Sequence, residues 1–195
     1  MTTGASDLWG EFGKYHAQGQ KGAEALGAEI ERIARKGGIS SPVTSSRGLR
    51  ARLRYLDSEA GRRALAEHGV SERLRRAWEG GRTPSRAKLA AVDAAYWDRR
   101  RANLIRSGAL KRLLDNEGRG RRIEIHPVDQ STVPEKRRRV VEQRTVTARY
   151  IWNDAVSAWA SGDLDTLDEI WDDVISDLDS DYAAYAYVGS IGISA

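Results

Sequence analysis

Basic side chains suited to anion recognition are concentrated in one short stretch of this sequence. Between residues 71 and 88, five arginines and one lysine alternate with two serines that can cap helices. A guanidinium group forms forked hydrogen bonds to phosphates and to the edge of guanine, and an ammonium group pairs with phosphates. The residues that this pattern selects for contact with an anionic polymer are Ser71, Glu72, Arg73, Arg75, Arg76, Arg82, Ser85, Arg86 and Lys88.

The surrounding sequence, RRALAEHGVSERLRRAWEGGRTPSRAKL, predicts two short helices joined by a tight turn. Gly69 tolerates the positive φ that the turn requires, and Val70 is expected to anchor the turn in the core. Ser71 is the expected cap of the second helix, whose N-terminal end then faces solvent. This pattern is typical of a helix-turn-helix over roughly residues 58–90, in which the second helix enters the major groove of DNA.

Hydrophobic spacing predicts which side of the second helix faces outward. Leu74 and Trp78 are expected to face inward. The outward side chains are then Glu72, Arg73, Arg75 and Arg76. Arg73 and Arg76 are expected to reach base edges. The expected phosphate contacts are Arg75, Arg82, Arg86 and Lys88.

A third helix is predicted from Ser85 to about Leu114, with Thr83 as its cap and Pro84 as its first residue. Its first backbone N–H groups add a second place for a phosphate. Two alternatives stay open. Arg75 stands three residues before Trp78, where the usual unit has an aliphatic residue, so the recognition helix can be rotated or shifted. The arginines can also be solvated side chains on an ordinary helical bundle.

Charge is distributed unevenly along the 195 residues. The whole chain has 32 basic and 28 acidic residues, a formal net charge of +4. Ten acidic and no basic residues lie in residues 151–195, so residues 1–150 carry a net charge of +14. A basic body with an acidic end is frequent among proteins that bind polyanions, although a solvated surface with an acidic helix gives the same count.

Several classes of chemistry lack the residues that they need. The chain has no cysteine, which excludes disulfides, thiolate metal sites and a cysteine nucleophile. His16, His68 and His126 are not at metal-ligand spacing, and the acidic run from Asp163 lacks the ligand positions and glycine of a calcium loop. No Ser–His–Asp pattern and no phosphate-binding GxxxxGK[S/T] loop is present. The sequence therefore predicts a protein that is not an enzyme and uses no cofactor or metal.

Membrane segments are not expected. No apolar run approaches the ~20 residues of a membrane span, and the N-terminal residues lack the pattern of a secretory signal. The expectation is a soluble, cytoplasmic protein without a membrane partner.

The sequence before the helix-turn-helix predicts an arm and two helices. Residues 1–22 are mostly small, polar and rich in glycine, with Trp9 and Phe12 as the expected large anchors, and form the arm. A helix is expected over 23–36, followed by a linker at 40–46. Ser46 is the expected cap of a short helix with leucines on one face. The arginines on the opposite face of that helix are Arg47, Arg50, Arg52 and Arg54.

After Asn116 the pattern changes to short strands and helices. Alternating residues predict strands over 122–128 and 182–193, and β-branched residues predict another over 140–147. Helices are expected over 150–160 and from Asp163 onward. The predicted fold class is α+β, mainly helical, with a helix-turn-helix bundle followed by a small three-stranded α/β unit. The predicted domains are 1–45 (arm and helix), 46–116 (helix-turn-helix with a long third helix) and 117–195 (acidic α/β unit for self-association or partner binding).

Three segments carry a resemblance to a known family. RGLRARLRYL, ALAEHGVSERLRRAW and GGRTPSRAKLAAVDAAYWDRRRANL, all within residues 47–104, resemble the terminal proteins of linear replicons in actinobacteria. The same segments resemble helix-turn-helix regulators of actinobacterial phages and plasmids. The resemblance implies DNA binding and, for a terminal protein, attachment of a DNA 5′ end to a side-chain hydroxyl. Thr132, Thr145 and Thr147 are candidates by position, although an ordinary role in loop or strand is the favoured interpretation for each.

The sequence thus predicts a sequence-preferring protein of an actinobacterial mobile or linear replicon that binds double-stranded DNA. Transcription regulation and a terminal protein at replicon ends are both compatible with this prediction. The expected partners are duplex DNA, a second copy of the chain in a homodimer and, at replicon ends, replication proteins. The alternative is an interaction protein whose basic face binds an acidic protein.

Overall fold

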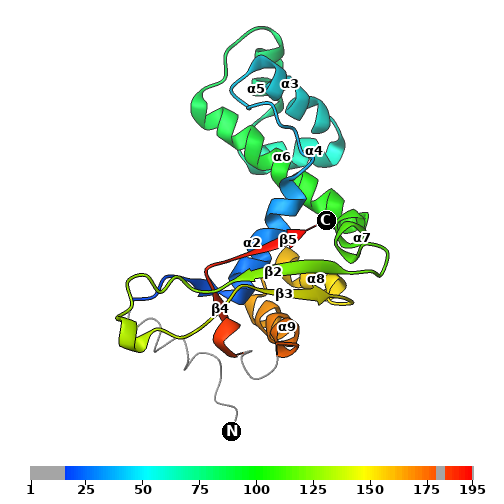
Figure 1. The fold of residues 1–195 in the computed structure, drawn as a ribbon. Helices are drawn as coiled ribbons and strands as arrows, with labels where there is room; N and C mark the ends of the chain where they lie inside the picture. Colours follow the sequence, from blue (N-terminus) through cyan, green and yellow to red (C-terminus); the bar gives the residue numbers. More distant parts are fainter. Residues whose placement is uncertain (1–15, 179–182, 195) are drawn as a thin grey trace. The chain divides into compact units, whose positions relative to one another are not determined.

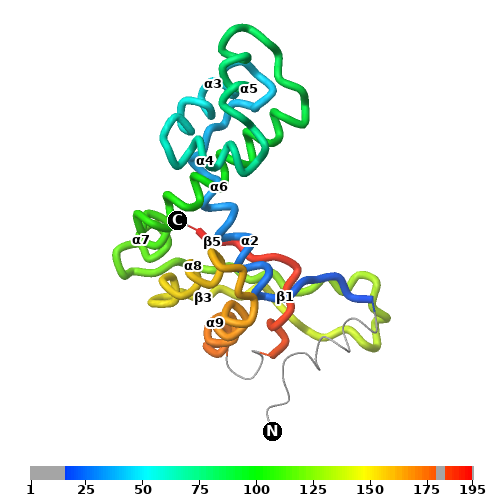
Figure 2. The backbone as a smooth tube through the Cα atoms, turned by 180° about the vertical axis from the view of Figure 1, so that it is seen from behind, coloured from blue at the N-terminus to red at the C-terminus, as the bar shows by residue number. Residues whose placement is uncertain are grey.

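The computed structural model describes residues 16–178 and 183–194, which fold into two compact units. Unit 1 is drawn from residues 1–33 and 108–195, and unit 2 comprises residues 34–107. Figures 1 and 2 show unit 2 as helical and unit 1 as a small sheet with helices. The predicted α+β, mainly helical fold class with a three-stranded sheet is confirmed. Within the described ranges, no helix has the length and apolarity needed to cross a membrane.

Unit 2 consists of four helices that each begin after a serine cap. They are α3 (Ser46–Tyr55), α4 (Glu59–Glu67), α5 (Glu72–Glu79) and α6 (Arg86–Arg106). The serine side chains accept hydrogen bonds from backbone N–H groups three residues on, which satisfies donors that have no partner inside the helix. Ser71 caps α5 as predicted. The predicted caps Ser46 and Thr83 are wrong, because Ser45 and Ser85 hold those positions.

The core of unit 2 lies where α3 and α4 pack against α6. Leu56, Leu65, Val70, Val92 and Tyr96 are all almost fully buried there. Val92 and Tyr96 stand four residues apart on one face of α6, and burial of this cluster holds the short helices in place.

Arg52 is the one charged side chain found buried among the described residues, and its predicted place on an outward face is wrong. Only 5% of the residue is exposed. Its guanidinium donates to Asp93 Oδ1 at 2.5 Å and to the Ser41 carbonyl at 2.8 Å, and it lies 5.3 Å from the ring centre of Tyr96. Arg52 therefore ties the linker before α3 to α6.

The predicted single helix from residue 85 to about 114 is also wrong. α6 ends at Arg106, and Gly108 has a φ of +65°, a left-handed conformation that interrupts the helix. A separate helix, α7 (Ala109–Asp115), follows. One of the two boundaries between the units falls at this glycine, and the other falls between Ile33 and Ala34.

Unit 1 is built on a three-stranded antiparallel sheet in the order β3–β2–β5. The sheet strands are β2 (Arg121–His126), β3 (Arg144–Ala148) and β5 (Ser190–Ser194), and β1 (Gln20–Lys21) pairs separately with β4 (Tyr187–Val188). The helices are α2 (Gly22–Arg35), α7, α8 (Trp152–Ser161) and α9 (Leu164–Ser176), with a 3-10 helix η1 (Glu135–Arg137) between β2 and β3. Figure 2 shows α2, α8 and α9 in front of the sheet, on one of its faces.

Alternation along the strands separates a buried from a polar sheet face. Ile123, Ile125 and Val146 point to the helices and are buried, whereas Thr145 and Thr147 are exposed on the opposite face. The predicted strand over 182–193 is divided at Gly189, so that β4 pairs with β1 and β5 pairs with β2. A Cβ atom at Gly189 would lie 2.6 Å from the Pro127 carbonyl oxygen, too close for any other residue without a shift.

The predicted N-terminal segment 1–45 is not a separate part of the fold. Leu26 and Ile30 of α2 are fully buried within unit 1, and the Gly22 N–H donates to the Ala186 carbonyl at 2.9 Å. The N-terminal residues belong to unit 1 because β1 pairs with β4, and no local sequence pattern reveals a contact between residues so far apart in the chain. Residues 1–15 of the predicted arm, Trp9 and Phe12 among them, lie outside the described residues.

Candidate nucleic-acid interface

The segment between α4 and α5 is a tight turn fixed by one glycine and one valine. Gly69 has a φ of +70°, the left-handed conformation expected for it. The Val70 N–H donates to the Leu65 carbonyl at 2.8 Å, and the valine side chain is 2% exposed. The turn is therefore anchored in the core, and the chain leaves it at Ser71, where α5 begins.

Helix α5 lies on the core without being buried in it. None of its residues from Glu72 to Glu79 is buried, while Leu74 and Trp78 are half-buried as expected for the inward face. Trp78 packs against the core of unit 2. Glu72, Arg73, Arg76 and Glu79 are exposed and open to contact by another molecule.

The structure corrects the role predicted for Arg75. Its side chain is only 14% exposed, and Nη1 lies 2.8 Å from Asp57 Oδ1, just before α4. Its Nε lies 3.4 Å from Glu72 Oε2 and 3.8 Å from Glu79 Oε1. Arg75 thus fills the inward position with an ion pair in place of an aliphatic side chain, and it faces carboxylates rather than solvent.

The Asp57–Arg75 contact also changes the acidity of the aspartate. The hydrogen bond from Arg75 and its positive charge lower the pKa of Asp57, with a smaller contribution from Arg62, whose Nη1 lies 3.3 Å away. Sequence reasoning missed Asp57 and Arg62. The available signal was an acidic residue directly before the cap of α4, although its partner stands 18 residues further on.

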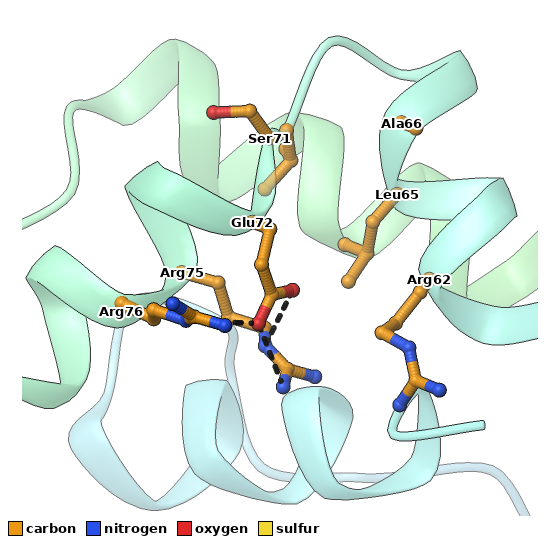
Figure 3. A pocket seen from close by; sticks show the side chains of 8 residues that line it. Arg62, Leu65, Ala66, Ser71, Glu72, Arg75 and Arg76 are labelled. Carbon is orange, nitrogen blue, oxygen red and sulfur yellow. Dashed lines mark hydrogen bonds and ion pairs between the residues drawn. The ribbon is translucent and has the colours of Figure 1, made fainter. Parts of the chain in front are cut away.

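Arg73 and Arg76, the two predicted base contacts, are both exposed. The Arg76 side chain is 75% exposed and its Nε lies 3.4 Å from Glu72 Oε1. Glu72 therefore stands between Arg75 and Arg76, as Figure 3 shows. Arg73 lies in the first turn of α5 and has no ion pair among the described residues.

A hollow separates α4 from α5 on this side of unit 2. Its lining residues are Arg62, Leu65, Ala66, Val70, Ser71, Glu72, Arg75 and Arg76 (Figure 3). A second groove, which sequence reasoning did not foresee, runs from α3 to the loop before α6, where Leu49, Leu53 and Trp78 lie near Arg50 and Arg82. Both hollows combine arginines with apolar side chains.

The remaining predicted contacts divide into two groups. Arg82, Ser85 and Arg86 are exposed around the start of α6, as expected for phosphate contacts. Lys88 is not available in the same way, because its Nζ donates to the Gly69 carbonyl at 2.6 Å. Lys88 therefore fastens α6 to the turn between α4 and α5.

The histidines and threonines singled out by sequence are spread over both units. His68 Nε2 lies 2.6 Å from Asp98 Oδ2 in unit 2. In unit 1 the Thr132 hydroxyl donates to the His16 carbonyl at 2.7 Å, while Thr145 and Thr147 are exposed on β3. Across the residues described, no group of three or more metal-ligating side chains comes together.

Comparisons with protein-family models, with curated proteins and with solved structures find no match to this chain. The resemblance to actinobacterial terminal proteins and regulators therefore stays a prediction. Unit 2 differs from unit 1 in its charge as well as in its helical geometry. Unit 2 holds 18 basic and 7 acidic residues, against 14 basic and 21 acidic residues in unit 1.

Proposed function

We propose that this chain binds double-stranded DNA with a preference for sequence, through a helix-turn-helix formed by α4, the turn at 68–71 and α5. The observation that carries the proposal is the setting of α5. It is a short helix without a buried residue, capped by Ser71 after a glycine turn and seated on the core through Trp78. A recognition helix in the major groove has this length, exposure and connection.

The exposed side chains have distinct roles in this proposal. Arg73 and Arg76 read base edges, because an arginine fork pairs with guanine in the major groove. Arg82 and Arg86 bind phosphates beside the N-terminus of α6, where the first N–H groups of the helix favour an anion. Glu72 orients Arg76 through its carboxylate.

Arg75 and Lys88 act as positioning residues rather than contacts. Arg75 joins α5 to the start of α4 through Asp57, and Lys88 joins α6 to the Gly69 carbonyl. Together they fix the angle at which α5 is presented, which matters because base contacts require placement within a fraction of an ångström.

The net charge of unit 2 supports the same assignment. Its 18 basic and 7 acidic residues give a field that attracts the phosphate backbone and releases counterions on binding. Many helix-turn-helix proteins pair two half-sites as dimers, and we propose a homodimer on this basis. Transcription regulation by a phage or plasmid protein and a terminal protein at replicon ends both use such an interface.

The experiment that tests the proposal is selection of the full chain against a random duplex library at moderate salt, followed by sequencing of the retained DNA. An enriched motif is the expected result, and a palindromic motif supports the dimer. Retention without a motif contradicts base reading by α5. Absence of retention even at low salt overturns the proposal and directs attention to an acidic protein partner.

A second assay distinguishes a terminal protein from a transcription regulator. A terminal protein accepts a labelled deoxynucleotide from its polymerase and keeps it after denaturation, because the bond is covalent. A transcription regulator does not become labelled.

A further inference from the structure

The long loop between β2 and β3, residues 127–143, carries a second concentration of positive charge. It is the yellow-green segment of unit 1 in Figure 1 and includes η1. Lys136, Arg137, Arg138 and Arg139 follow one another in it. The proposed helix-turn-helix lies in unit 2 and does not use this loop.

The base of the loop is fastened to the N-terminal part of unit 1. Gln18 and Asp129 exchange two backbone hydrogen bonds, each 2.9 Å long. Val128 and Val133 are buried together with Ala17 in a small apolar cluster. The base of the loop is therefore joined to the N-terminal part of unit 1 by backbone hydrogen bonds and by this small cluster.

One arginine of the basic run points back into the loop. Arg138 Nε donates to the Val133 carbonyl at 2.8 Å, and its Nη2 donates to the Ser131 carbonyl at 3.0 Å. The Gln130 side chain also exchanges two hydrogen bonds with the backbone of Arg139, at 3.0 and 2.8 Å. These bonds fix the backbone conformation at residues 138 and 139.

The basic run lies at the surface of unit 1. Lys136, Arg137 and Arg139 are exposed, and Glu135 is the only acidic residue between 135 and 139. Unit 1 has 21 acidic residues against 14 basic ones, and four of the 14 are in this run. The loop is thus a local cationic surface in a unit of opposite net charge.

We propose that Lys136, Arg137 and Arg139 form a second contact with the DNA backbone, so that the chain binds duplex DNA with both of its units. The inference rests on the proposed function of unit 2. Guanidinium and ammonium groups bind phosphate oxygens, and a loop that is already ordered loses little conformational entropy on binding. Because phosphates carry no sequence information, this contact strengthens binding to every sequence alike.

The test compares two triple variants of the full chain. The first is Lys136→Ala, Arg137→Ala and Arg139→Ala, which leaves the Arg138 and Gln130 side chains that bond to the loop backbone. The matched control is Lys111→Ala, Arg122→Ala and Arg149→Ala, which removes the same charge from exposed positions of the same unit. Affinity for a duplex that extends beyond the selected motif on both sides is measured from about 50 to 200 mM salt.

The expected result is a loss of affinity of at least about tenfold in the loop variant at low salt, with its salt slope smaller by about 2.7 for three phosphates. The motif that it selects stays the same as that of the unmodified chain. The control variant keeps the affinity and slope of the unmodified chain.

Three outcomes overturn the inference. If the unmodified chain binds DNA and the loop variant binds as well as it does, the second contact is absent while the function of unit 2 stands. If both triple variants lose affinity equally, the effect is one of net charge and not of the loop. If the unmodified chain fails to bind at low salt, the proposed function falls and the second contact falls with it.

Discussion

Three arginines within four residues of α5 have three different environments. Arg73 is exposed, Arg75 is almost enclosed beside Asp57, and Arg76 is exposed but held near Glu72. The difference follows from the helical period, which turns neighbouring residues to different sides. A long apolar stem also lets arginine fill a position that an aliphatic residue would otherwise hold, provided that its charge is paired.

Removal of either proposed base-reading side chain should relax sequence preference. Arg73→Ala and Arg76→Ala are each expected to reduce discrimination at one base pair by about 1–3 kcal/mol, the contribution of one forked contact to guanine. Arg86→Ala should instead weaken binding to all sequences. Affinities for the selected motif and for single-base variants of it provide the measurement.

Arg106→Ala is the matched control for these variants, because it lies at the opposite end of the 21-residue helix that begins with Arg86. At 1.5 Å per residue the two positions are roughly 30 Å apart. Unchanged base preference in folded Arg73→Ala and Arg76→Ala proteins would mean that another surface reads the DNA.

The ion pair between Asp57 and Arg75 should make stability depend on pH in the acidic range. Arg75 lowers the pKa of Asp57 in the folded state, so the stabilisation is present above the ordinary aspartate pKa and is lost as pH falls through the lowered value. Asp57→Asn should therefore lower the denaturation midpoint at neutral pH. The gap to the unmodified chain should close as pH decreases below about 4.

Glu59→Gln serves as the control for Asp57→Asn, since Glu59 pairs with Arg63 where both side chains are largely exposed. Exposed pairs of this kind contribute little, so a smaller pH-dependent difference is expected. Equal curves for the two variants would show that Asp57 is no more than a surface charge.

At the scale of elements, the turn between α4 and α5 depends on Gly69. Gly69→Ala is expected to destabilise unit 2 by about 1 kcal/mol, because its φ of +70° is unfavourable for a residue with a Cβ atom. It should also weaken DNA binding, since the turn sets the orientation of α5. Thermal unfolding and duplex affinity are the two measurements.

Gly80→Ala provides a comparison at the other end of α5. Gly80 has a φ of −78°, and a Cβ atom there would make ordinary contacts, the nearest at 3.5 Å from the Arg76 carbonyl oxygen. Little change in stability is expected. If both alanine variants behave alike, the left-handed conformation of Gly69 is not the reason for its presence.

Elements with strong local signals could be predicted from the sequence. Ser71 caps the helix that it was expected to cap, and β2 lies within two residues of its predicted bounds. β3 and β5 coincide only with the last residues of the strands predicted over 140–147 and 182–193. The break at Gly108 was missed because apolar residues continue at helical spacing across it.

The candidate site was also predictable where local sequence signals determine it, and not where distant residues do. The exposure of Arg73, Arg76 and Arg86 follows from hydrophobic spacing. The enclosure of Arg75 and the attachment of Lys88 to Gly69 do not, since their partners are 18 and 19 residues away in the sequence. Arg52 was misplaced for the same reason, because Asp93 lies 41 residues further on.

At the scale of the whole molecule, the two units have opposite net charge and separate cores. Unit 2 carries the basic excess and unit 1 the acidic excess. The core of unit 2 is made of residues from α3, α4 and α6, together with the turn at Val70. A change in that core is therefore expected to act on unit 2 alone.

Arg52→Met tests whether unit 2 can be destabilised without an effect on unit 1. It leaves Asp93 and the carbonyl of Ser41 without their buried partner, and should destabilise unit 2 by about 3 kcal/mol. Arg52→Lys should not restore stability, because one ammonium group cannot replace the guanidinium fork. Backbone hydrogen exchange should accelerate in residues 46–106 and stay unchanged in β2, β3 and β5. Faster exchange in both units would mean that they unfold as one.

Arg54→Ala is the control for Arg52→Met. Arg54 lies on the same helix but is exposed. Its removal is expected to change stability by no more than about 0.5 kcal/mol.

The discontinuity of unit 1 determines the order in which the chain can fold during its synthesis. Unit 2 is complete once residue 107 has left the ribosome, whereas the sheet of unit 1 must wait for β5, which ends at Ser194. At about 5–20 residues per second, the interval is roughly 4–17 seconds. During this interval, Leu26 and Ile30 of α2 lack the partners that later bury them, so the nascent chain carries an amphipathic helix with an uncovered apolar face next to a finished unit 2.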